Sequence, residues 1–443
     1  MLTAEEKKIT RASLEMALEA GASKARASLS KNTMSIVATL DGEVDKVTGC
    51  LDRSISLNLF VDGRYGTFST NKLDEKSLRA FIGKAVGTTR MLAADACRDL
   101  PDPARTAKDA SGGNELGICD PAWSSVTPDQ RIAYALNNGV KTKSGKGWKL
   151  ISEEGEYSDS QYFNYVVDTQ GLEVLHSETS FEFFTELTIQ DSKGRKYSGG
   201  WWEAAPLLRD FHPEKVAPAA LQEAVMQIGP KSCPGGKYRA VIDSEVSQKV
   251  LNPVLNALNA FNIQQKNSFL LDKAGEKVFS EHLTILDCAR AGGETGSRLF
   301  DSEGVATTAF PIIDKGVVTR YFVNTYIAGK TGMAPTIEDA TRPKVLPFGG
   351  CKTREDVLRK VGDGILVTGF NGGNSNSSTG DFSYGIEGFA FRDGKIVHPV
   401  REVLVTGNFI TLWNNLVAVA DDARLCMSKL IPTLAFENVD CNA

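Results

Sequence analysis

The segment that most constrains the fold of this chain is a run of eight residues just past its midpoint. Residues 229–236 read GPKSCPGG and hold three glycines and two prolines. Because glycine and proline interrupt both helices and strands, such a run is typical of a linker between two folding units. The length of 443 residues also fits two domains. We therefore predict an N-terminal domain over residues 1–229 and a C-terminal domain over residues 237–443.

The residues before this linker switch between helical and strand patterns. Thr3-Ala4-Glu5-Glu6 has the spacing of a helix capping box, and apolar residues at helical spacing follow as far as Gly21. From Ala25 to Ser69 the apolar residues alternate, with Asp-Gly pairs where the chain would turn. Further helices are expected over 75–92, 129–138 and 214–228, and further strands over 148–190. This pattern predicts a domain of helices and antiparallel sheet.

The residues after the linker are richer in strand signals. A short strand is expected at Tyr238–Ile242, followed by a helix that begins at Asp243 or Ser244. The turn sequences Asp314-Lys315-Gly316 and Asp393-Gly394 indicate hairpins. The fold class is therefore predicted as α+β, with a mixed helix and antiparallel-sheet N-terminal domain followed by a β-rich C-terminal domain.

The charge balance and the apolar runs narrow the choice of partners. Fifty Lys and Arg residues against fifty-five Asp and Glu residues give a net charge of −5, which offers no global attraction to nucleic acid or to an anionic membrane. No apolar run approaches the roughly 18 residues that span a bilayer. The first residues lack the basic-then-apolar pattern of a secretory leader. We expect a cytoplasmic protein without direct nucleic-acid or membrane contact.

Histidine and cysteine are placed unfavourably for a local metal motif. No two of the four histidines are close enough to form a helical ligand pair. They are His176, His212, His282 and His398. The eight cysteines form no C-x-x-C pair, and we expect them to be reduced and mostly buried.

Three motif-like segments fail the requirements of the chemistry they resemble. Gly329-Lys330-Thr331 lacks the glycine that a phosphate-binding loop needs five positions earlier, since that residue is Asn324. The glycine-rich residues 291–296 lack dinucleotide-binding spacing, and a flexible connection is the better interpretation. The serine-hydrolase elbow G-x-S-x-G is absent because the last position of the nearest match is Ser377.

Acidic residues beside glycines in the C-terminal half are candidates for a cleft or partner surface. They are Asp301, Glu303 and Asp381, and Ser383 follows the last of them. Paired carboxylates can perform acid–base chemistry. Asp and Ser beside Gly more often accept hydrogen bonds from backbone N–H groups in turns, and we favour that interpretation.

The helix after Tyr238–Ile242 combines an apolar stripe with a proline. Pro253 would interrupt the interior of a helix, so we predict that Asn252 caps a fresh helical start with Pro253 at its first position. Asn252 and Asn256 then share a polar face, which could line a cleft, although simple solvation is the default interpretation.

Three ordered segments carry a resemblance to a known family. They are Lys266-Asn267-Ser268-Phe269-Leu270-Leu271-Asp272, Phe300-Asp301-Ser302-Glu303-Gly304-Val305 and Thr379-Gly380-Asp381-Phe382-Ser383. Supporting matches are Gly388-Phe389, Asp393-Gly394-Lys395-Ile396, Pro399-Val400, and Gly407-Asn408 before Trp413. The ordered set resembles the PmbA/TldE branch of the TldD/PmbA family, whose older label is modulator of DNA gyrase.

The resemblance implies a paired assembly in which TldD and TldE chains act together as a cytoplasmic zinc protease on small, largely unfolded peptides. In the TldD branch, one helix carries H-E-x-x-x-H, whose histidines bind zinc while the glutamate serves as general base. The corresponding residues 252–257 of this chain read NPVLNA, so both histidines and the glutamate are missing. Cys426 lies where TldD has a further ligand, and we expect it to be an inert, buried thiol.

These implications favour a non-catalytic PmbA/TldE-like subunit that has no metal of its own. It would complete a peptide cleft beside a TldD-like zinc subunit, in a homo- or hetero-oligomer, and exposed strand edges would pair with the extended peptide. The candidate cleft or partner loops are 299–305 and 371–384. One alternative is a non-proteolytic regulator of DNA gyrase or its inhibitors through protein contacts. The other is a stand-alone, metal-free hydrolase that uses Asp381, Ser383 and Glu303.

Overall fold

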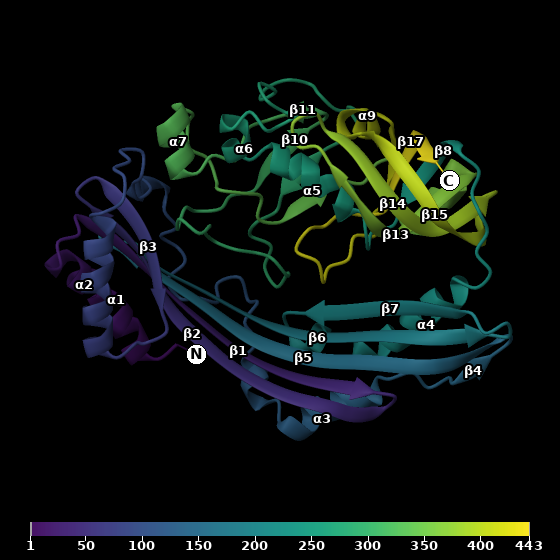
Figure 1. The fold of residues 1–443 in the computed structure, drawn as a ribbon, viewed down its shortest axis with the longest axis horizontal. Coiled ribbons are helices and arrows are strands. Elements are labelled where there is room, and N and C mark those ends of the chain that lie inside the picture. Colours follow the sequence, from purple (N-terminus) through teal and green to yellow (C-terminus); the bar gives the residue numbers. More distant parts are fainter. Residues whose placement is uncertain (1, 443) are drawn as a thin grey trace.

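The computed structural model describes residues 2–442 and confirms the α+β class. Figure 1 shows the N-terminal half, from purple to teal, as a long curved sheet, with the C-terminal half, from teal through green to yellow, above it. The domain boundary between residues 229 and 237 stays a prediction, and the two halves are the residues before and after it.

One large antiparallel sheet organises the N-terminal half. Its strands are β1 (Lys24–Leu40), β2 (Glu43–Val61), β3 (Arg64–Thr70), β4 (Ser144–Gly145), β5 (Trp148–Asp168), β6 (Glu173–Asp191) and β7 (Lys196–Ala205). The helices are α1 (Ala4–Glu19), α2 (Glu75–Thr89), α3 (Pro128–Asn137) and α4 (Val216–Met226). The strand order is β3-β2-β1-β5-β6-β7, and β4 pairs with β5. One edge of the sheet is therefore β7. The other edge is β3, together with the part of β2 that does not pair with β3.

Local sequence signals account for the first elements of this half. Thr3 caps α1 in a complete capping box with Glu6. Asp41 and Asp62 adopt φ values of 52° and 50°, and each is followed by a glycine with positive φ. Two consecutive positive φ values are what a tight hairpin turn requires, so these Asp-Gly pairs reverse the chain between β1, β2 and β3.

Helices cover the sheet in separate patches. The apolar faces of α1 and α2 bury strand residues that include Leu57 and Leu59. Helix α3 packs over Val37 and Tyr157, and α4 packs over Leu187. Burial of each such side chain contributes roughly 1.5–3 kcal/mol, which fixes the register of the long strands.

The C-terminal half contains a six-stranded sheet, a small four-stranded sheet and short helices. The larger sheet consists of β8 (Gly236–Ile242), β13 (Gly364–Ser375), β14 (Asp381–Arg392), β15 (Lys395–Asn408), β16 (Leu416–Val419) and β17 (Leu434–Asn442). The smaller sheet consists of β9 (Ile285–Asp287), β10 (Phe310–Asp314), β11 (Val317–Val318) and β12 (Pro343–Val345). The helices are α5 (Gln248–Ala257), α6 (Ala260–Gln264), α7 (Thr325–Thr331), α8 (Arg354–Val361) and α9 (Phe409–Asn414).

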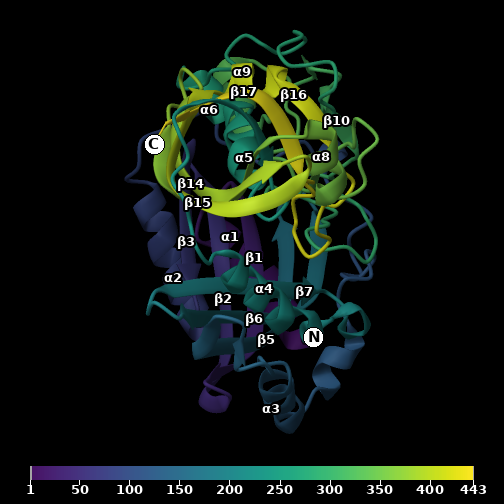
Figure 2. The same ribbon diagram turned by 90° about the vertical axis from the view of Figure 1, so that its right-hand side faces the viewer.

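The larger sheet closes on itself. Its order is β15-β14-β13-β8-β17-β16, and β15 also pairs with β17 through Leu404–Thr406 and Asp440–Asn442. Figure 2 shows the resulting ring nearly end-on. One face of its strands shares a core with α5, and the other face shares a core with α8. Both faces are therefore covered, and α5 is held against a closed scaffold.

Two predictions about the region of α5 are wrong. The helix begins at Gln248 and not at Asp243 or Ser244, because a carboxylate oxygen of Asp243 accepts the N–H of Glu245 at 3.0 Å and forms a turn first. Pro253 lies inside α5 and does not start a new helix. An interior proline costs about 3 kcal/mol. Burial of the Val and Leu side chains at positions 250, 251, 254 and 255, at roughly 1.5–3 kcal/mol each, outweighs that cost.

The predicted loop over 371–384 is also wrong in extent. Strand β13 continues to Ser375 and β14 begins at Asp381, so only residues 376–380 form the connecting turn. Gly-rich sequence favoured a loop, but cross-strand pairing overrides that preference: Gly372 and Gly373 pair with Gly385 and Tyr384.

Candidate functional site

The two acidic residues of the 299–305 loop are both bound to backbone groups. One carboxylate oxygen of Asp301 accepts the N–H groups of Glu303 and Val305, each at 2.9 Å, and the other accepts that of Glu338 at 3.2 Å. Burial raises the pKa of Asp301 to about 6, although these hydrogen bonds act in the opposite direction. The carboxylate of Glu303 accepts the N–H and the hydroxyl of Thr325 at the start of α7. The contacts of Asp301 with Glu303 and Val305 have the form that the turn interpretation expects, whereas Glu303 binds a residue of a separate segment.

Asp381 and Ser383 begin β14 in a separate set of contacts. The carboxylate of Asp381 accepts hydrogen bonds from the Asn408 amide at 2.9 Å and the Thr379 hydroxyl at 2.6 Å, and these donors lower its pKa. Ser383 pairs with Thr406 on β15. No hydrogen bond or ion pair within residues 2–442 links Asp381 or Ser383 to Glu303. The three residues of the hydrolase alternative thus have separate partners.

The asparagines of α5 differ from each other in their surroundings. Asn252 is half-buried, and its side-chain oxygen accepts a hydrogen bond from the Lys429 ammonium at 2.5 Å. Burial lowers the pKa of Lys429, and the charge of Asp339 opposes that shift. Asn256 is exposed, and its backbone carbonyl accepts from the Asn262 amide at 2.8 Å. Only Asn252 therefore points to a charged neighbour.

The residues of α5 do not fit a zinc ion. At the positions of the TldD-type H-E-x-x-x-H motif, this chain offers an amide bound to an ammonium group, then Pro253, then the buried methyl group of Ala257. Zinc sites use thiolate, imidazole and carboxylate ligands, and a nearby ammonium repels a second cation. In the part of the chain that the structure describes, no three His, Cys, Asp or Glu side chains gather as metal ligands.

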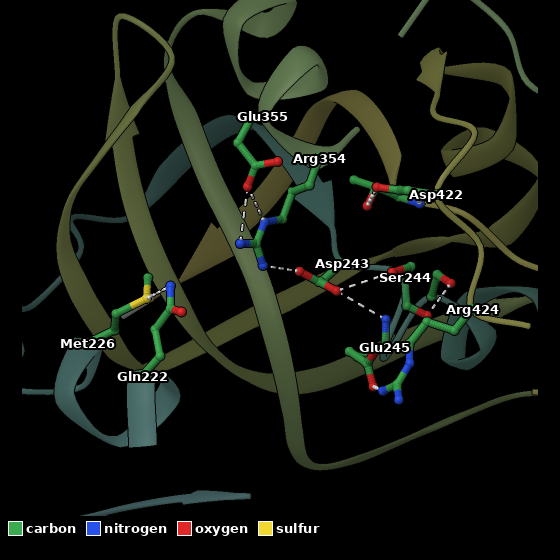
Figure 3. A network of polar contacts seen from close by, with 11 residues as sticks. Gln222, Met226, Asp243, Ser244, Glu245, Arg354, Glu355, Asp422 and Arg424 are labelled. Atoms are coloured by element: carbon green, nitrogen blue, oxygen red, sulfur yellow. Dashed lines mark hydrogen bonds and ion pairs between the residues drawn. The ribbon is translucent and has the colours of Figure 1, made fainter. Parts of the chain in front are cut away.

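A charged network next to α5 joins the two halves of the chain. Figure 3 shows the pairing of Arg424 with Glu245 in this network. Arg424, in the segment between β16 and β17, pairs with Glu245 just before α5 and with Glu203 of β7 at 3.3 Å. It also donates to the backbone carbonyl of Trp202. Its guanidinium carbon lies 4.6 Å from the ring centroid of Trp201. Arg424 therefore binds β7 of the N-terminal sheet to the start of α5.

A second arginine extends this network. Arg354, the first residue of α8, pairs with Asp243 at 2.7 Å. A polar cavity of about 200 Å³ lies beside both arginine sites and is lined by residues of β7, α4 and the turn before α5. Burial raises the pKa of Glu223, which lines the cavity from α4. The boundary between the halves is therefore charged and only partly filled.

Among the carboxyl groups of the network, Glu245 has the most strongly shifted pKa. Burial raises its pKa to about 7, although Arg424 acts to lower it. One of its two oxygens is buried without a hydrogen-bond partner. A carboxylate with a pKa near neutrality can change its charge at physiological pH, which links the charge state of this boundary to pH.

Cys426 lies next to this network and is buried. Burial raises its pKa to about 11, although Arg424 acts to lower it. A thiol of this kind is protonated at neutral pH and is a poor metal ligand and nucleophile. The expectation of an inert thiol is consistent with this environment.

The sequence predictions missed the charged network. Glu245 and Arg424 are 179 positions apart, and no pattern in a single sequence joins them. The available signals were the acidic turn at 243–245 directly before a buried helix and the adjacent Trp201 and Trp202 on one strand. Neither signal specifies an arginine as the partner.

Comparisons with known proteins agree with this architecture. Residues 235–443 match the family model described as the PmbA/TldA metallopeptidase C-terminal domain. The metalloprotease PmbA of Escherichia coli O157:H7 is 25% identical, over 97% of this chain and 96% of that protein. A crystal structure from Bacteroides thetaiotaomicron, described as a candidate modulator of DNA gyrase, is 39% identical with a TM-score of 0.95 and full coverage of both chains.

A more distant structure shares the fold. TldE from Thermococcus kodakarensis has a TM-score of 0.80 at 17% identity, over 99% of this chain and 100% of that chain. Together, the full-length similarity and the match of the C-terminal half define a PmbA/TldD-type metallopeptidase fold. The chain belongs to the PmbA/TldE family.

The described helices also bear on membrane association. None of those within residues 2–442 is both long enough and apolar enough to cross a bilayer.

Proposed function

We propose that this chain is the non-catalytic, PmbA/TldE-like subunit of a cytoplasmic TldD/TldE-type zinc protease that cleaves small, unfolded peptides. The observation that carries the proposal is the bond between Lys429 and Asn252 on α5. It places an ammonium group beside the helix that would hold the metal in a TldD-type chain. Zinc and its activated water would belong to the partner.

The role of this chain would be to shape the peptide cleft. Helix α5 and residues 421–430 would form one wall of that cleft, and the ion pairs of Arg424 with Glu203 and Glu245 would hold this wall to β7. An extended peptide would add its backbone to an exposed strand edge, as in other forms of strand addition. The turns that hold Asp301, Glu303, Asp381 and Ser383 remain proposed contacts for the cleft or the partner.

Co-expression tests this role directly. The chain is purified alone and together with a TldD-like chain from the same genome, and each sample is assayed for cleavage of unstructured peptides. We expect cleavage only by the pair, and loss of cleavage when the glutamate of the partner's H-E-x-x-x-H is replaced by glutamine. Chelator-sensitive cleavage by this chain alone would contradict the proposal. A Glu303→Gln variant in the same assay tests the proposed contact role of that loop, and co-purification of the two chains shows whether they still assemble.

The second candidate is a regulator of DNA gyrase or of its inhibitors through protein contacts. It is favoured by the 39% identical Bacteroides protein, which is described as a candidate modulator of DNA gyrase. The net charge of −5 argues for a protein contact and against direct contact with DNA. Affinity capture that recovers gyrase without a TldD-like chain would favour this candidate over the first.

A further inference from the structure

The outer edge of β2 is open over most of its length. Strand β2 pairs with β1 on one side, but it pairs with β3 only from Ile55 to Val61. From Glu43 to Ser54 its second edge has no strand partner among residues 2–442. This edge lies on the opposite side of the sheet from β7, which faces the C-terminal half (Figure 1). An open edge presents unpaired N–H and C=O groups to another strand.

The side chains along this edge are exposed and partly apolar. Val47 and Leu51 are each 61% exposed, and Cys50 is exposed between them on the strand. Val47 lies opposite Val37 of β1, which α3 buries, so the apolar surface of this face continues outward to the edge. Apolar side chains on an open edge are unfavourable for an isolated sheet and typical of a strand that pairs.

The order of the charges specifies one self-pairing. Side chains alternate between the two faces of a strand. When two antiparallel copies pair, the same face of each copy lies on the same side of the joined sheet only if opposed residues are both even-numbered or both odd-numbered. With Gly49 opposite Gly49 of a second copy, Lys46 lies opposite Asp52 and Val47 lies opposite Leu51. Each of these contacts occurs twice around the two-fold axis. Shifting the register by two residues places Asp52 opposite Val44 or Thr48 and loses both matches.

We propose that residues 46–52 of β2 pair with the same residues of a second copy of this chain, which joins two N-terminal sheets into one. The contact excludes Arg53, which already binds Glu6 at 3.3 Å. Opposite charges directly across antiparallel strands are favourable and like charges are unfavourable, so the sequence of this edge selects the register as well as the partner. The contact needs no other protein, so it holds whether or not the proposed peptidase role is correct.

Charge reversal tests the register in the purified full-length chain. Sedimentation velocity over a concentration series is expected to show a dimer. Lys46→Asp and Asp52→Lys should each weaken it at least about tenfold, because each creates two like-charge contacts. The double variant should restore the dimer. Lys76→Asp on α2 makes the same charge change away from the edge and should have no effect.

A cross-link tests the geometry. A thiol at position 49 fits, because a Cβ there meets nothing within 4 Å. In a Cys50→Ser background, Gly49→Cys should form a covalent dimer with a short bis-maleimide, whereas Glu43→Cys should not, because its two copies lie far apart along the antiparallel pair. A monomer at every concentration would overturn the proposal. So would a dimer that survives the single reversals, or an edge that binds only a TldD-like chain or a peptide.

Discussion

The ammonium nitrogen of Lys429 lies 2.5 Å from the side-chain oxygen of Asn252. The first residue stands in the segment between β16 and β17, and the second stands on α5, so the bond connects two parts of the C-terminal half that are far apart in sequence. Because the ammonium is half-buried, its charge is weakly screened and acts strongly on its surroundings. This chain therefore places a lysine ammonium group next to α5, the helix that corresponds to the H-E-x-x-x-H segment in the resemblance to TldD.

The first prediction concerns that bond. In a double-mutant cycle, Lys429→Met and Asn252→Ala should couple by about 1.5–3 kcal/mol in the free energy of unfolding, because a hydrogen bond to a charged group contributes about this much. Urea denaturation measures the four stabilities. The matched cycle of Lys429→Met with Asn256→Ala should show no coupling, since Lys429 bonds to the side chain of Asn252 and the exposed Asn256 takes part in a different contact. Equal coupling in both cycles would show that the bond contributes nothing.

The second prediction concerns Arg424. Its side chain is 11% exposed and pairs with Glu203 and Glu245, so Arg424→Ala should leave two carboxylates without their cation and cost about 3–5 kcal/mol. Arg424→Lys should lower the free energy of unfolding by less than Arg424→Ala does. It should still be destabilising, because a lysine cannot reproduce the planar contacts with both carboxylates and a carbonyl. Denaturant unfolding followed by tryptophan fluorescence reports on both stability and the nearby Trp201 and Trp202. Arg209→Ala, at a side chain 78% exposed, is the control and should be close to neutral.

The third prediction concerns pH. The pKa of Glu245 is about 7 in the folded chain, against an ordinary value of 4.5. Between these values the folded state binds more protons than the unfolded state, so raising the pH lowers the free energy of unfolding. The loss should reach about 3 kcal/mol over this window. Glu245→Gln should remove that part of the pH dependence, whereas Glu214→Gln at an exposed site should retain it.

The measurement for Glu245 is a difference between profiles. Asp301 also has a raised pKa and loses stability in the same direction, so only the difference between the parent chain and Glu245→Gln isolates one group. Parallel profiles for the two proteins between pH 4.5 and pH 7 would contradict the assignment.

The fourth prediction concerns thiol reactivity. With a pKa of about 11, Cys426 should be ionised to roughly one part in a thousand at pH 8 and should resist alkylation in the native chain. Exposed Cys50 should be modified first. Peptide mass mapping after timed iodoacetamide treatment measures both rates, and unfolding in urea should make them similar. Native modification of Cys426 as fast as that of Cys50 would refute the assignment.

Local patterns explain the elements that the sequence predicted well. The capping box at Thr3 and the Asp-Gly turns depend on neighbouring residues alone, and α1 and the β1–β2–β3 hairpins follow from them. Pro253 was misplaced because burial of the apolar side of α5 overrides a local preference that the sequence shows clearly.

Long-range contacts explain what the sequence could not show. The candidates Asp301, Glu303 and Asp381 were found as residues, but their partners, Glu338, Thr325 and Asn408, come from other segments. The pairing of Arg424 with Glu203 and Glu245 depends on how β7 meets the turn before α5, which only the assembled fold determines.

The closed ring of the C-terminal half also has a consequence for folding during synthesis. Strand β8 begins at Gly236, and it pairs with β13 and with β17, which ends at Asn442. Pairings of such separation pay a large loop-closure cost before they stabilise anything, so they form slowly. On the ribosome, β8 and α5 emerge long before β17 and must wait with apolar surface uncovered. The demand for chaperone protection should therefore be highest while this second half is being made.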